Sequence, residues 1–186
     1  MTATATDFRT LTGTYTVDLA HSRFGFVARH AMVTKVRGAF NEFDGTAVID
    51  GDNPGNSSVD VTLAVASIDT RNAQRDQHLR TNDFLDAERY PAITFKSTAV
   101  SHVAGNEFEV TGDLTIKDVT KSVSFPLEFQ GAVKDPFGND RIGFEGDVVI
   151  NRRDWGVNWN AALETGGVLV SEKVTLEIEI SAVKTA

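Results

Sequence analysis

Asn106-Glu-Phe-Glu-Val-Thr-Gly-Asp-Leu-Thr-Ile-Lys117 is the stretch of sequence that decides the fold class. Polar residues alternate along it with apolar residues and one glycine, so an extended chain has one dry side and one wet side. The dry side consists of Phe108, Val110, Gly112, Leu114 and Ile116. Such a period of two predicts a β-strand that is buried on one face and exposed to water on the other.

The same alternation recurs along most of the chain. It predicts further strands at Tyr15–Asp18, Ser22–His30, Lys35–Asp50, Ser58–Val65, Ala92–Ser101, Lys121–Gln130, Arg141–Ile150 and Thr175–Ile180. The segments between them are rich in Gly, Asn, Asp and Pro, as turns are. Within Lys35–Asp50 the apolar parity slips, which predicts a bulge or bend between Gly38 and Phe43, as at a barrel corner.

Eight or nine antiparallel strands, each with one apolar face, must bury those faces together. A two-sheet sandwich and a closed barrel both achieve this. A strand of about 12 residues spans roughly 40 Å, so the longest predicted strands indicate an elongated body. If that body is a barrel, its interior is a long, narrow and apolar cavity.

One segment departs from the alternation. Residues 70–86 are polar and include a predicted short helix, which Asp69 or Thr70 caps and which reaches about Arg80. Its apolar content is too low for a core helix, so we expect it to cover one end or edge of the sheet. Residues 1–186 are expected to form a single domain, with residues 1–13 as a flexible N-terminal lead.

Composition narrows the class of function. Eighteen Lys and Arg against 26 Asp and Glu give a net charge of −8, which opposes non-specific binding to nucleic acid or to an anionic membrane. Twelve Phe against two Tyr and two Trp suit a site that is dry throughout, either a packed core or a lipid-lined cavity. No secretory signal and no apolar run near the ~20 residues of a membrane helix is visible, which predicts a cytoplasmic protein.

The usual signatures of enzymes and nucleotide-binding proteins are missing from the sequence. Without cysteine, disulfides and thiolate ligands are excluded. Ser22, His30 and Asp76 are the residue types of a catalytic triad, but nothing in the sequence places them in the geometry that a triad requires. We therefore expect no enzyme, no cofactor and no metal; a metal site made by folding from His30, His78 and Asp76 is the alternative.

A series of motifs, in a fixed order, resembles the YceI-like family. The resemblance covers about Tyr15 to Ile180, nearly the whole chain. It implies a lipocalin-like, extended antiparallel β-barrel of the all-β class, and association with polyisoprenoid lipids. The motifs are Asp18-Leu-Ala-His-Ser-Arg-Phe-Gly-Phe-Val-Ala-Arg-His30, Val36-Arg-Gly-Ala-Phe-Asn-Glu-Phe43, Ser67-Ile-Asp-Thr-Arg-Asn72, Arg75-Asp-Gln-His-Leu-Arg80, Phe84, Tyr90-Pro-Ala-Ile-Thr-Phe-Lys-Ser97, Gly112-Asp-Leu-Thr-Ile-Lys-Asp-Val-Thr-Lys121 and Asn151-Arg-Arg-Asp-Trp-Gly156.

The candidate ligand-binding residues are apolar side chains of the interior and polar side chains of the helical segment. In a sandwich the apolar ones are simply core, whereas in a barrel some line the cavity. Arg75, His78 and Arg80 are expected at a barrel mouth, where they meet a headgroup; alternatively, Arg75 and Asp76 tie the segment to neighbouring loops by ion pairing. The full set is Phe24, Phe26, His30, Val36, Phe40, Phe43, Ile68, Arg75, His78, Leu79, Arg80, Phe84, Phe95 and Phe129.

We expect Phe24, Phe26, Phe40 and Phe95 to point into the cavity. His30 has the same strand parity as Phe24 and Phe26 and is therefore expected to face inward too. The predicted function is a carrier for a long isoprenoid lipid, either a polyprenyl phosphate or an isoprenoid quinone. An enzyme acting on such a lipid and a filled β-sandwich interaction module are the alternatives. Transient membrane contact and a homodimer stay open as partnerships, while nucleic acid is not expected.

Overall fold

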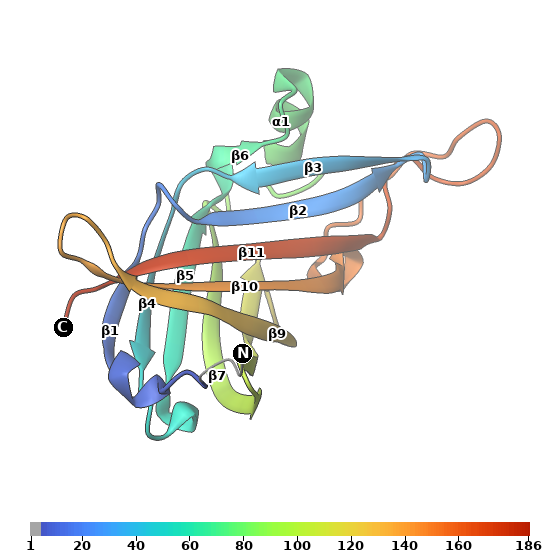
Figure 1. Ribbon diagram of the computed structural model, residues 1–186. Coiled ribbons are helices and arrows are strands. Elements are labelled where there is room, and N and C mark those ends of the chain that lie inside the picture. The colour runs from blue at the N-terminus through green and yellow to red at the C-terminus, as the bar shows by residue number, and fades with distance from the viewer. Residues whose placement is uncertain (1–4) are drawn as a thin grey trace.

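In the computed structural model, which describes residues 5–186, one antiparallel sheet of eleven strands curls into a barrel (Figure 1). The strands are β1 Gly13–Val17, β2 Arg23–His30, β3 Thr34–Phe40, β4 Phe43–Ile49, β5 Ser58–Ala64, β6 Ile68–Asp69, β7 Ala92–Ala104, β8 Glu107–Ile116, β9 Val119–Lys134, β10 Asp140–Asn151 and β11 Lys173–Lys184. The helix α1 covers Ala73–Arg80, and four 3-10 turns are η1 Phe8–Leu11, η2 Pro54–Asn56, η3 Val65–Ser67 and η4 Arg152–Trp155.

Closure depends on β11, which pairs with three strands. The order β1-β4-β5-β7-β8-β9-β10-β11 returns to β1 and makes a closed eight-stranded barrel. The C-terminal part of β11 pairs with β1, through Val183 opposite Thr16, whereas its N-terminal part pairs with β2, through Leu176 opposite Phe26. Strands β2, β3 and β6 therefore extend the wall beyond the closed part. The predicted extended antiparallel barrel is confirmed.

The predicted bend between Gly38 and Phe43 is a full break between two strands. Strand β3 ends at Phe40, where it pairs with Ile68 of β6, and β4 begins at Phe43, where it pairs with Leu63 of β5. The chain changes neighbours at this corner because it passes from the extension into the closed barrel. Asn41 and Glu42 form the link between the two strands.

The N-terminal segment, predicted to be a flexible lead, includes a 3-10 turn that contacts the barrel. Phe8–Leu11 forms η1, and Phe8 packs edge-on against Phe108 and Phe129 with ring centroids 5.1 and 5.5 Å apart. We call this the lower end of the barrel, after its place in Figure 1, where η1 and η2 lie. The apolar contacts of the Phe8 ring place this otherwise polar segment against the barrel. Residues 1–4 of the predicted lead lie outside the described residues.

The other end carries α1, at the top of Figure 1, together with η4 and the long segment 156–172, which lie to the right; we call it the upper end. The helix begins after Asn72, whose side chain accepts a hydrogen bond from the Arg75 N–H, rather than after Asp69 or Thr70. Helix residues and the segment meet in a buried cluster that includes Ile68, Phe84 and Trp155. The predicted helical cover of one barrel end is thus present.

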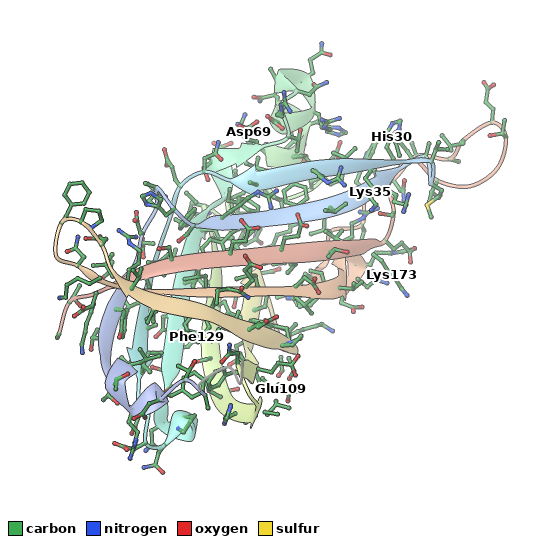
Figure 2. All side chains as sticks on the ribbon, viewed as in Figure 1. His30, Lys35, Asp69, Glu109, Phe129 and Lys173 are labelled. Carbon is green, nitrogen blue, oxygen red and sulfur yellow. The ribbon has the colours of Figure 1, made fainter. Side chains whose placement is uncertain are left out.

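The dry face of β8 points inward along its whole length. Val110, Leu114 and Ile116 are buried, while Glu107, Glu109 and Asp113 on the other face are exposed. Figure 2 shows Glu109 pointing away from the barrel wall. Strand parity therefore separated interior from exterior correctly in the stretch that decided the fold class.

Tyr15 ties the lower end to the barrel wall. Its side chain is only 2% exposed, and its hydroxyl donates a hydrogen bond of 2.9 Å to the Leu11 carbonyl at the end of η1. Burial raises the pKa of this phenol. The bond is the polar link between η1 and β1.

We expect Tyr15→Phe to lower the free energy of unfolding by about 1–2 kcal/mol, because the buried Leu11 carbonyl loses its partner. Urea denaturation measures the change. Tyr90→Phe is the matched control, since within residues 5–186 the Tyr90 hydroxyl makes no hydrogen bond, and it should change stability by less than about 0.5 kcal/mol. Equal effects of the two substitutions would contradict this role of Tyr15.

Candidate functional site

Two apolar cavities follow each other along the inside of the barrel. The upper cavity has a volume of about 130 Å³ and the lower cavity one of about 80 Å³. Both are lined by Val59, Val110, Leu127 and Ile180. These four residues, which we call the junction, stand between the two cavities, and the cavities are therefore neighbours inside the barrel.

The volumes are small for a ligand site. Pockets for small molecules usually hold roughly 300–1,000 Å³, more than either compartment offers. Phe95 accounts for part of the filling, because its ring lies directly over Gly112 and leaves no space for a side chain there. A long ligand therefore has to displace interior side chains as it enters.

Three of the predicted phenylalanines lie on the cavity wall. Phe24, Phe40 and Phe95 line the upper cavity. Phe24 packs edge-on against Phe43, with ring centroids 4.8 Å apart, so Phe43 supports the wall from behind. Phe95 packs on Phe125 at 5.5 Å.

Phe26 and His30 depart from the prediction that they face the cavity. Phe26 lies over Gly38 and beside Phe40, and it packs into the upper core without lining either cavity. His30 is exposed at the end of β2, where Figure 2 shows it on the projecting β2–β3 hairpin. The pairing of β2 with β11 ends at Val27, and beyond it β2 lies against segment 156–172, where His30 forms a bridge with Val170. His30 therefore lies outside both cavities.

The remaining apolar candidates belong to the packing at the two barrel ends. Val36 is half-buried on β3. Phe129 is buried in the lower cluster beside Phe8 and Phe144. Ile68, Leu79 and Phe84 belong to the upper cluster.

His78 caps this upper cluster with its ring. It meets Phe84 edge-on at 5.0 Å and Trp159 at 4.7 Å, and its Nε2 lies 2.8 Å from the Asp83 carboxylate. The histidine thus joins α1 to segment 156–172. Trp159 was not among the candidates, although the aromatic residue after the Arg153-Asp154-Trp155-Gly156 turn was visible in the sequence.

Arg75 and Arg80 fasten the helix to the chain before it. Arg75 donates through Nε to the Thr70 hydroxyl at 2.7 Å and through Nη2 to the Thr70 carbonyl at 2.8 Å. Arg80 donates to the carbonyls of Ala66 and Ile68 at 3.0 and 3.2 Å. These contacts favour the structural alternative, because the guanidinium groups already have acceptors in the protein.

Asp76 completes this attachment without an ion pair to Arg75. The buried carboxylate accepts hydrogen bonds from the Thr70 N–H, at 2.9 Å, and from the Thr70 hydroxyl, at 2.5 Å. Thr70 therefore stands between the arginine and the carboxylate. The structural alternative from the sequence named the two residues that attach the helix. Both residues, however, form hydrogen bonds with Thr70 in place of the expected ion pairs.

Arg152 is a residue whose role the sequence did not indicate. It is buried and donates hydrogen bonds to the carbonyls of Ser171 at 2.9 Å, Val157 at 2.7 Å and Val170 at 3.4 Å. Burial lowers the pKa of its guanidinium. It holds both ends of segment 156–172 over the upper end of the barrel, while Trp155 anchors η4 through its indole N–H to the Leu114 carbonyl at 2.9 Å.

The charged residues along the cavity lining are acidic. Among residues 5–186, Asp50 borders the lower cavity, Glu177 borders the upper one and is ion-paired with Arg23 at 3.1 Å, and no Lys, Arg or His lines either. The pKa of Asp50 is lowered, mainly by a hydrogen bond from the Asn53 N–H and next by one from the Asn56 side chain. This carboxylate therefore stays negative at neutral pH. Within the described residues 5–186, no cluster of potential ligands is placed to hold a metal ion, and no helix is long and apolar enough to cross a membrane.

We expect Arg75→Gln combined with Arg80→Gln to lower the free energy of unfolding by about 1–3 kcal/mol, since the helix loses several hydrogen bonds. Binding of a prenyl alcohol and of the corresponding prenyl phosphate should fall by the same factor. Arg71→Gln is the control, because the exposed Arg71 guanidinium makes no hydrogen bond to residues 5–186. A selective loss of the phosphate ligand would show instead that the two arginines meet a headgroup.

Comparison with known proteins gives consistent results. The model of the YceI-like domain family matches residues 15–182. A UPF0312 protein of Staphylococcus aureus is 39% identical over 166 residues, which cover 88% of this chain and 93% of that protein.

Solved structures share the fold. BcnA of Burkholderia cenocepacia superposes with a TM-score of 0.79 at 28% identity, over 89% of this chain and 98% of BcnA. The YCEI protein of Campylobacter jejuni has a TM-score of 0.73 at 28% identity, over 85% and 90% of the two chains. A polyisoprenoid binding domain from Saccharophagus degradans has a TM-score of 0.68 at 15% identity, over 92% and 98%; this last likeness concerns the fold alone.

Proposed function

The chain belongs to the YceI-like family, and we propose that it is a binding protein that holds one long isoprenoid lipid inside its barrel. The observation that carries the proposal is the pair of apolar cavities that lie next to each other inside the barrel and share Val59, Val110, Leu127 and Ile180. The Saccharophagus domain, which shares the fold, is a polyisoprenoid binding domain, so the proposed ligand class is one that this fold can hold.

The binding energy comes from the tail of the ligand. Each methylene moved from water to a dry interior contributes about 0.8 kcal/mol, so a prenyl chain of many carbons binds without any hydrogen bond. Part of this gain offsets the displacement of side chains such as Phe95. A long and flexible chain fits this requirement better than a compact rigid ligand, because it can follow a narrow path through both compartments.

The headgroup we propose is uncharged, as in an isoprenoid alcohol or quinone. Burying a phosphate without a cation is costly. Among residues 5–186 the charged lining residues are Asp50 and Glu177, whose partner Arg23 is not part of the lining, and no Lys, Arg or His lines either cavity. The arginines of α1 are bonded to protein carbonyls and the Thr70 hydroxyl. Of the two ligand types that the sequence suggested, the lining therefore favours the quinone over the polyprenyl phosphate.

The small cavity volumes favour one rival, a filled barrel that acts only as an interaction module. The two readings differ in what happens at the junction between the compartments. A lipid that is longer than one compartment has to pass Val110, whereas an interaction module has no ligand there. Chain length of the ligand is thus the variable that separates them.

We expect Val110→Phe to weaken binding of a long fluorescent prenyl alcohol at least tenfold, since the larger ring closes the junction and overpacking of this kind costs about 1–3 kcal/mol. A short analogue of two isoprene units, which fits one compartment, should lose less than about threefold. The control Val149→Phe changes an exposed valine on the outside of β10. If the native protein binds neither analogue, the proposal fails.

A further inference from the structure

The turn between β2 and β3 exposes apolar side chains. Met32 is 57% exposed and Val33 is 75% exposed. Short hairpin turns normally use Gly, Asn or Asp, and here Ala31 and Met32 have positive φ angles of 51° and 59°. A positive φ is energetically unfavourable for residues other than glycine. The stability of the fold alone therefore does not favour Ala31 and Met32 in this turn.

Segment 156–172 holds the turn in place. The Ala31 N–H donates to the Leu169 carbonyl at 2.7 Å, and the Ser171 N–H donates to the Arg29 carbonyl at 3.0 Å. Val168 on this segment is 36% exposed. We call Met32, Val33 and Val168 the hairpin tip.

Cations surround the hairpin tip. Arg29 lies directly opposite Lys35 in the β2–β3 register, and Arg37 is two residues further along the same outer face. Lys173 begins the neighbouring strand β11, and Figure 2 shows Lys35, Lys173 and His30 at the same end of the molecule. Among residues 5–186 the side chains of these arginines and lysines form no ion pair with an acidic residue, and like charges opposite each other destabilise a sheet.

Two exposed acidic residues lie near the tip, Glu164 in segment 156–172 and Glu172 beside Lys173, and Glu172 pairs with Arg153 at 2.9 Å. A larger acidic group lies farther away. Glu107, Glu128, Glu145 and Glu179 stand in one row across β8 to β11, each opposite the next. From Lys173 to Glu179 the strand covers six residues, about 20 Å. This distance exceeds the ~8 Å Debye length at physiological salt, so the acidic row does not cancel the positive charge of the tip.

We propose that the hairpin tip docks on an anionic lipid bilayer, with Met32, Val33 and Val168 inserted among the headgroups and Arg29, Lys35, Arg37 and Lys173 facing the lipid phosphates. Apolar side chains ringed by Lys and Arg are the arrangement that lies in a membrane interface. The acidic row on the other part of the barrel then orients the tip toward the surface. The purpose of the docking, exchange of a lipid with the membrane, rests on the proposed function.

The exposed Phe137 provides a natural comparison. It is 88% exposed in the β9–β10 turn, and its neighbours are Asp135, Lys134 and Asp140. Its side chain is more exposed than that of Met32, but its surroundings do not suit an anionic surface. Phe137 is therefore a control for hydrophobicity without positive charge.

Co-sedimentation of the full chain with vesicles tests the proposal. The native protein should bind phosphatidylcholine vesicles that contain phosphatidylglycerol, bind pure phosphatidylcholine poorly, and dissociate as salt rises. Arg29→Gln with Lys35→Gln should lower the partition coefficient roughly thirtyfold, at about fivefold per cation. Met32→Ser with Val33→Ser should lower it about tenfold.

Three controls separate docking from damage to the fold. Lys96→Gln with Lys121→Gln, and separately Phe137→Ser, should leave vesicle binding unchanged. Ala31→Gly with Met32→Asn should raise the melting temperature by a few degrees, since both residues accept a positive φ, and yet lower vesicle binding. A stabilised variant that binds less cannot be explained by unfolding.

The proposal is overturned if the native protein does not bind anionic vesicles, or if the tip variants bind them as strongly as the native protein does. Equal binding to soluble polyglutamate, unaffected by the Met32 and Val33 changes, would assign the patch to an acidic macromolecule and also overturn it. Binding of a prenyl alcohol in vesicle-free solution should be unchanged in all tip variants. Vesicle binding without any prenyl binding would sink the proposed function and leave the docking surface standing.

Discussion

The structure depends on β11, which forms backbone hydrogen bonds with the edges of two strands, β1 and β2. An open edge exposes unpaired N–H and C=O groups and invites aggregation. Strand β11 avoids this by pairing its last residues with β1 and its first residues with β2, while β10 covers its other side along the full length. Because the sheet closes, every strand has an inner face, and the inner faces together form a dry interior.

The same arrangement explains why the interior is long. A barrel closed by β1 and β4 alone would end where those short strands end. The β2–β3 hairpin continues the wall past them, and α1 with segment 156–172 covers the space that results. The polar groups of this cover, including Arg75, Arg80 and Arg152, are bonded to protein carbonyls, so the interior receives apolar side chains and almost no charge.

Sequence reasoning succeeded where one physical pattern decides the outcome. The alternation in residues 106–117 predicted which side of β8 is buried, and Phe24, Phe40 and Phe95 do lie on the cavity wall. It failed where the answer depends on which strands are neighbours. Parity puts His30 on the inward side of β2, but only the pairings show that β11 ends at Val27 and that His30 lies against Val170 of segment 156–172, away from both cavities. Likewise, the charges of Arg75 and Arg80 were visible, whereas the carbonyls that accept their hydrogen bonds come from the turn before the helix.

Native mass spectrometry of the purified protein, before and after organic extraction, tests the central claim most directly. If the barrel is a lipid-binding site, one apolar ligand accompanies each chain, its mass fits an isoprenoid series, and the extracted protein takes up an added long-chain isoprenoid quinone in a ratio of one to one. A protein that carries no lipid and shows no mass shift with the added quinone would contradict the account, and the two cavities would then be packing defects of a filled core.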